Sequence, residues 1–164
     1  MSRSMAKMQF EGIDQYVAML KRLGSDTKDL CGRAIYAGAD VVADAVRSQI
    51  GTLPVAQKFS KNGEKINTIT SAQKAGLLAG LGIAPMKQEG TGYNVKVGFA
   101  GYNNQKTKSY PGGQPNSVIA RSICSGTSFR QKNDFVGRAA RSAKGAAEAA
   151  MQKALDEELD KRTL

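Results

Sequence analysis

The amino-acid sequence predicts an α+β fold in which long amphipathic helices pack on a small antiparallel sheet with a β-hairpin and extended loops. Three observations lead to this prediction. Two long stretches, 27–50 and 133–162, repeat apolar residues with the period of a helix. Residues 93–99 alternate apolar and polar residues with the period of a strand. Two polar stretches, at about 52–70 and 100–117, show neither period and contain residues typical of loops.

The first 24 residues predict a short strand followed by a short helix. "KMQFEG", residues 7–12, alternates in polarity and ends at a glycine. "IDQYVAMLKRLG", residues 13–24, ends in Gly24, which suits the end of a helix. The apolar face of this helix would contain Ile13, Val17 and Leu20.

The stretch 27–50 predicts a long amphipathic helix. Gly51 fits its end, and Pro54 follows shortly after. Its apolar side would consist of Leu30, Ala34, Ile35, Val41, Val42, Ala45, Val46 and Ile50.

The middle of the chain predicts short elements between loops. Residues 52–70 form a basic loop or arm, and "AQKAGLLAGLG", residues 72–82, forms a short helical turn. A hairpin covers residues 82–99, with "EGTG" as its turn. A second long loop, 100–117, follows it. "SVIARSICSGTS", residues 117–128, fits either a strand or a short turn of helix.

The last predicted helix begins near Asn133 or Asp134, either of which is a favourable N-cap. Its narrow, mostly alanine face would allow another element to approach closely. Its charges oppose the helix dipole, because basic residues come early and acidic residues come late. The alternative interpretation is an ordinary amphipathic helix with a solvated outer side. The predicted apolar face contains Phe135, Ala139, Ala143, Ala146, Ala150 and Ala154.

The charge of the chain indicates an anionic partner. The 164 residues, expected to form one domain over 1–164, contain 24 Lys and Arg against 14 Asp and Glu, a net charge of +10. Residues 51–132 hold 11 basic and 2 acidic side chains, so most of the excess lies there. Nucleic acid or an acidic protein surface would suit it, and simple solubilisation is the alternative. The sequence also predicts a soluble protein made in a cytoplasm, without a membrane partner.

The sequence offers no pattern of catalytic residues. It contains no histidine, the commonest general base and metal ligand, and no phosphate-binding loop or nucleophile elbow. Its two cysteines, Cys31 and Cys124, form neither a zinc pattern nor a disulfide framework. We therefore expect a protein that is not an enzyme, with no cofactor, no catalytic or metal-binding residues and no small-molecule ligand.

The order of elements and several short motifs resemble the neck and tail-completion proteins of tailed bacteriophages, a family typified by a tail component of lambdoid phages. "GTLPV" follows the first long helix, as in that family, but the "KAGLLAG" element comes after a longer insert. The sequence departs from the family pattern at Asp134 and Gly137, where the family has prolines. It also departs at 123–125, Ile-Cys-Ser here, where the family has an acidic residue before Gly-Thr. The matching residues are Phe10, Gly12, Ile13, Asp14, Val17, Leu20, Gly126, Thr127, Phe135, Val136, Arg138 and Ala139.

This resemblance implies a structural virion protein, assembled in the host cytoplasm. Copies of the chain would form a sixfold or twelvefold ring in the head–tail connector. That ring would complete or terminate the tail and join it to the head while the genome passes. Its partners would be head-closure or adaptor proteins, tail tube or terminator proteins, and passing double-stranded DNA.

The charged helix suggests how such a ring would hold together, because each subunit of a ring meets the next through two different surfaces. The basic surface would be Arg138, Arg141 and Lys144, and the acidic surface would be Asp156, Glu157, Glu158 and Asp160. The alternative function is sequence-independent nucleic-acid binding, which would be strongly salt-dependent. The candidate contacts with DNA or an acidic partner are Lys58, Lys61, Lys65, Lys106, Lys108, Arg130 and Lys132.

Overall fold

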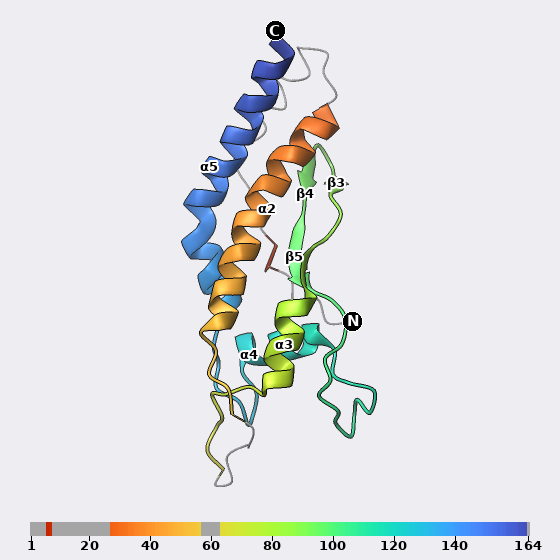
Figure 1. The fold of residues 1–164 in the computed structure, drawn as a ribbon, viewed down its shortest axis with the longest axis vertical. Helices are drawn as coiled ribbons and strands as arrows, with labels where there is room; N and C mark the ends of the chain where they lie inside the picture. The colour runs from red at the N-terminus through yellow and green to blue at the C-terminus, as the bar shows by residue number, and fades with distance from the viewer. Residues whose placement is uncertain (1–5, 8–26, 57–62, 164) are drawn as a thin grey trace.

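A computed structural model describes residues 6–7, 27–56 and 63–163. It contains helices and small antiparallel sheets, so the predicted α+β class is confirmed (Figure 1). Apart from β1 (Ala6–Lys7), the strand predicted at 7–12 and the helix predicted at 13–24 lie outside the described residues. The helices are α2 (Thr27–Gly51), α3 (Ser71–Gly80), α4 (Asn116–Ser125) and α5 (Phe135–Thr163).

The long helices α2 and α5 run antiparallel side by side and form the main packing contact of the molecule (Figure 1). Most of the apolar side predicted for α2 is buried. Small residues at the contact let the two backbones approach closely. A Cβ atom added to Gly38 would come within 2.7 Å of the Met151 side chain.

The apolar face predicted for α5 is correct only in its first half. Ala146 is exposed, and Ala150 and Ala154 are only partly buried. The contact follows every fourth residue along the helix, the spacing of the ridges by which helices commonly interdigitate. The buried ridge is Phe135, Ala139, Ala143, Ala147, Met151 and Leu155.

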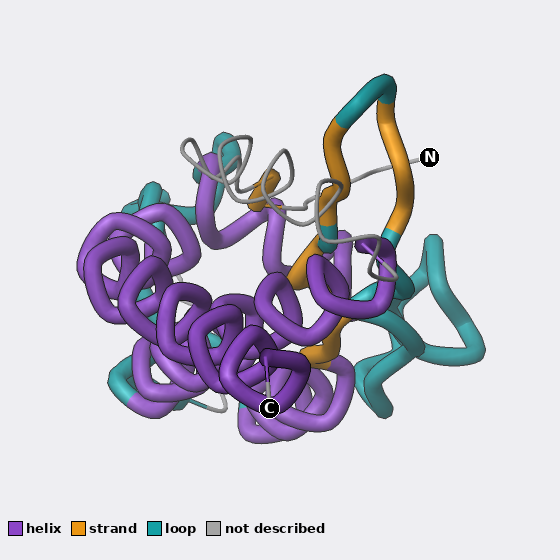
Figure 2. The backbone as a smooth tube through the Cα atoms, turned by 90° about the horizontal axis from the view of Figure 1, so that it is seen from above, coloured by secondary structure: helices purple, strands orange, loops and turns teal. Residues whose placement is uncertain are grey.

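A three-stranded antiparallel sheet in the order β1–β5–β2 pairs β5 (Lys96–Phe99) with β1 and with β2 (Leu81–Ile83). The β2–β5 pair continues into a second ladder, β3 (Lys87–Glu89) with β4 (Gly92–Asn94), so the predicted hairpin is present. Between the ladders, three residues, 84–86, oppose two, 95–96. This offset is a β-bulge that includes Pro85, and the turn of the outer hairpin projects from the body of the protein (Figure 2).

The described parts of the two long connections are tied to the body of the protein by backbone and side-chain hydrogen bonds. After α2, the Lys74 ammonium donates to the carbonyl oxygens of Gly51 and Leu53, at 2.9 and 3.1 Å. The Val55–Ile69 and Ile66–Arg130 bridges then join three distant segments. The loop at 100–115 is closed by a hydrogen bond from the Asn103 backbone N–H to the Gln114 carbonyl oxygen, and it projects from the body of the protein (Figure 2).

The short helices α3 and α4 pack on each other through glycines and buried amides. Residues 117–125, for which strand and helix both fitted, belong to α4. The Asn116 amide donates to the Ala100 carbonyl oxygen at 2.9 Å and lies against α3. A Cβ atom on Gly80 would overlap that same carbonyl oxygen. This close approach therefore requires glycine at the end of α3.

A matched pair of glycine substitutions tests this packing. Gly80→Ala should lower the free energy of unfolding by about 1–3 kcal/mol, because the new methyl group displaces backbone. Gly145→Ala, on the exposed side of α5 with no atom within 4 Å of the new Cβ, should raise it by about 0.5–1 kcal/mol. Urea unfolding followed by circular dichroism measures both changes. If the two substitutions changed the free energy of unfolding equally and in the same direction, the close approach at Gly80 would be contradicted.

Candidate functional site

The charged residues of α5 lie at two ends of a straight helix pair. Arg138, Arg141 and Lys144 are exposed in its first turns, where α5 passes the end of α2 (Figure 1). Asp156, Glu157 and Asp160 are exposed near its other end, beside the start of α2. Residues 138 and 160 are separated by about 33 Å along the helix. The two groups therefore cannot contact each other within one chain.

The basic end is held in place by neighbours in the same chain. The Arg138 guanidinium donates to Asn133 Oδ1 at 2.7 Å and to Gln49 Oε1 at 3.3 Å. Arg141 lies 3.5 Å from an oxygen of Asp134. The other Asp134 oxygen accepts from the Gly137 N–H at 3.1 Å, so Asp134 caps the helix as predicted. This end therefore presents oriented cations rather than loose side chains.

Glu158 differs from the other acidic residues because it is buried against α2. Its Oε1 lies 2.9 Å from Arg33 Nη1 and 3.3 Å from Lys161 Nζ. Arg33 also lies 3.4 Å from Asp29. The hydrogen bond from Arg33 lowers the pKa of Glu158 below its ordinary value. Glu158 is thus buried, and the exposed part of the predicted acidic surface is Asp156, Glu157 and Asp160. Asp156 accepts a hydrogen bond from Gln152, and Glu157 lies 4.0 Å from Lys153.

Five of the residues predicted to contact DNA or an acidic partner lie in the described part of the chain. Lys58 and Lys61 lie outside the described residues. Arg130 is only 4% exposed, and its Nη1 donates to the Thr68 carbonyl oxygen at 2.7 Å. The exposed members of the set are Lys65, Lys106, Lys108 and Lys132.

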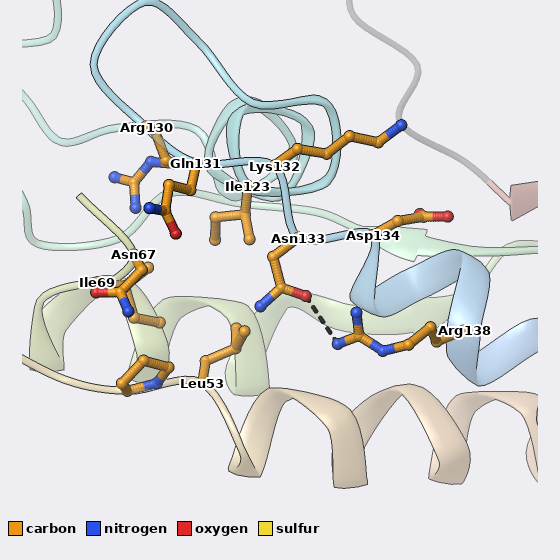
Figure 3. Close-up of a pocket in the computed structure, with 11 residues that line it drawn as sticks. Leu53, Asn67, Ile69, Ile123, Arg130, Gln131, Lys132, Asn133, Asp134 and Arg138 are labelled. Carbon is orange, nitrogen blue, oxygen red and sulfur yellow. Dashed lines mark hydrogen bonds between the residues drawn. The ribbon is translucent and has the colours of Figure 1, made fainter. Parts of the chain in front are cut away.

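A polar cleft of about 460 Å³ lies beside the basic end of α5. Figure 3 shows Arg130 at one side and Arg138 at the other, with amide side chains between them. Four separate segments line it: the chain after α2, the segment 67–69, α4, and residues 130–134 with the start of α5. Its lining comprises Leu53, Pro54, Asn67, Ile69, Ile123, Arg130, Gln131, Lys132, Asn133, Asp134 and Arg138.

A second, more apolar cavity of about 600 Å³ lies between the start of α2 and the hairpin. The Met86 N–H donates to the Tyr36 hydroxyl oxygen at 2.8 Å across it. Lys28, Asp29, Gly32, Arg33 and Pro85 complete its lining.

Both cysteines lie in the described part of the chain, one buried and one partly buried. Cys31 and Cys124 are free thiols, and burial raises the pKa of both, which disfavours the nucleophilic thiolate. Residues 6–7, 27–56 and 63–163 contain no group of three or more potential metal-ligating side chains. In that same part of the chain, every helix is too short or too polar to cross a membrane.

The pattern of the sequence does not reveal the cleft or the Arg33–Glu158 pair. Arg130 and Thr68 are 62 residues apart, and Arg33 and Glu158 are 125 apart. No periodicity relates such distant positions. The one local signal is that Glu158 falls three residues after Leu155, on the same side of the helix.

The Arg33–Glu158 pair predicts a pH dependence. Because the folded-state pKa of Glu158 is lowered, its stabilisation is present above about pH 4.3, the ordinary glutamate pKa, and is lost as the pH falls below it. Glu158→Gln should therefore unfold more easily than the unmodified chain at pH 7, and the difference should shrink by pH 3. Thermal unfolding at both pH values measures this. Glu157→Gln, at an exposed site, should show no such difference, and an equal effect of both substitutions would refute the assignment.

The sequence matches no protein-family model, no curated protein and no solved structure.

Proposed function

We propose that this chain is a structural virion protein of a tailed phage, a ring subunit of the head–tail connector that completes or terminates the tail. The proposal begins from the resemblance of its short motifs to neck and tail-completion proteins. In this role the ring joins the tail to head-closure or adaptor proteins on one side and to tube or terminator proteins on the other. The genome passes through it.

The observation that carries the proposal is the separation of charge along the α2–α5 pair. Cations are oriented at one end of α5, and carboxylates are exposed at the other, about 22–33 Å away along the helix. Two different surfaces on one rigid body are what a head-to-tail contact requires, and such contacts close into rings when the rotation between subunits allows it. The Gln49 and Asn133 contacts of Arg138 reduce the entropy lost when that contact forms.

The projecting hairpin and the 100–115 loop support the same role. An isolated two-stranded hairpin is marginally stable in water, and β3 is exposed along its whole length. Tyr102, at the base of the 100–115 loop, is 73% exposed. Both features suit contacts with adjacent subunits or with the next layer of the connector.

Solution mass gives the first test. Light scattering and negative-stain microscopy, at low and high salt and with tails of the encoding phage, should show a ring alone or on the tail end. We expect high salt to weaken the ring, because exposed ion pairs are screened. A monomer that does not bind tails but binds duplex DNA in a salt-dependent way would instead establish the nucleic-acid-binding alternative.

A charge exchange tests the contact itself. Arg138→Glu with Arg141→Glu should abolish rings, because it places carboxylates opposite carboxylates. Adding Asp156→Lys and Glu157→Lys to the same chain should restore rings, since the attraction returns with reversed sign.

Circular dichroism should show that each variant keeps its helices. If the Arg-to-Glu variant forms rings as well as the unmodified chain does, the charged contact is refuted. The ring would then be held together by other contacts.

A further inference from the structure

Arg130 is a buried cation without a counter-ion in the described structure. Its side chain is 4% exposed, and one of its donors, Nη1, meets the Thr68 carbonyl oxygen. Its buried Nε donates no hydrogen bond within the described residues. Across those residues, no carboxylate lies within 4.0 Å of its guanidinium, whereas Arg33, Arg47 and Arg141 each have one. Burying a charge is costly unless it is paired, so this arrangement calls for a compensating anion.

The cleft beside Arg130 collects further groups that bind anions. Arg138 lines its opposite side, with its guanidinium held by Asn133 (Figure 3). The amides of Asn67 and Gln131 lie between the two arginines, and Lys132 extends outward at the rim (Figure 3).

Asp134 is the only acidic residue in the lining, and both of its oxygens have partners. One accepts from the Gly137 N–H, and the other lies 3.5 Å from Arg141. The cationic groups of the cleft are thus not neutralised by Asp134.

We propose that this cleft is a binding site for a phosphate group. Three cations and one carboxylate line the cleft, which leaves an excess of two positive charges. A phosphate monoester carries about −1.5 to −2 charges at pH 7 and so matches this excess better than a ligand with one carboxylate does. Arginine and amide N–H groups are the usual donors to phosphate oxygens.

The volume of about 460 Å³ and the apolar lining of Leu53, Ile69 and Ile123 leave room for an organic group attached to the phosphate. The two sources are therefore free phosphate and a phosphate ester of a small molecule. The inference does not depend on the ring.

The test is a titration of the full-length protein followed by NMR, with the Nε–H resonance of Arg130 as the reporter. The probes are inorganic phosphate and deoxyadenosine monophosphate, in a phosphate-free buffer with ionic strength held constant by NaCl. We expect saturable shifts of the Arg130 Nε–H and of the backbone amides 131–134. Arg138→Gln should weaken binding at least about tenfold, because a charged hydrogen bond is lost. Lys108→Gln, which removes the same charge at a distant exposed site, should leave the affinity unchanged.

Each outcome is decisive for the site. Tighter binding of the nucleotide than of phosphate assigns a phosphate ester, and equal binding assigns free phosphate. The proposal fails if neither probe saturates or if Arg138→Gln binds as well as the unmodified protein. It also fails if only a single-stranded oligonucleotide without terminal phosphates binds, because the cleft would then contact a polymer backbone.

Discussion

The close antiparallel packing of α2 against α5 is the contact on which the rest of the structure depends. Its small residues, Gly38, Ala39, Ala143 and Ala147 among them, leave little side-chain volume between the backbones. Such a seam buries modest apolar area per residue, so its stability comes from close contact along many turns. The α3–α4 layer and the sheet then cover the remaining apolar side of α2, and Phe135 stacks obliquely on Phe99 of β5.

Polar contacts hold both ends of this seam. At one end Arg33 of α2 meets Glu158 of α5, and at the other Gln49 of α2 meets Arg138 of α5. Each contact fixes the register of the two helices, because a shift by one turn would separate the partners by about 5.4 Å. The cleft follows from the same geometry. Beyond Gln49 the two helices end, and segments with both polar and apolar side chains line the space between them.

Features that depend on local sequence pattern could be predicted, whereas contacts between residues far apart in the sequence could not. The bounds of α2 and α5 were foreseeable from helical periodicity and from caps such as Asp134. The buried side of α5 was not, because a run of alanines carries little information about which of them faces inward. Met151 and Leu155 were the informative positions, and they identify Ala147 instead of Ala146. The burial of Arg130 arises from the 66–69 segment, which only the tertiary fold brings beside it.

The reversed charges of α5 can now be divided into two parts. Asp134 caps the first turn, and a cap of this kind contributes about 0.5–2 kcal/mol. Each opposing basic residue costs about 0.3–1 kcal/mol when exposed, so the cap offsets roughly one or two of them. At the other end Glu158 is compensated by Arg33 and Lys161. The helix therefore tolerates its charge order without any partner. The exposed charges on its outer side are Arg141 and Lys144 at one end and Asp156 and Glu157 at the other, and their partners in the chain are themselves at least partly exposed. These four residues define the narrowest surface through which one copy would meet the next.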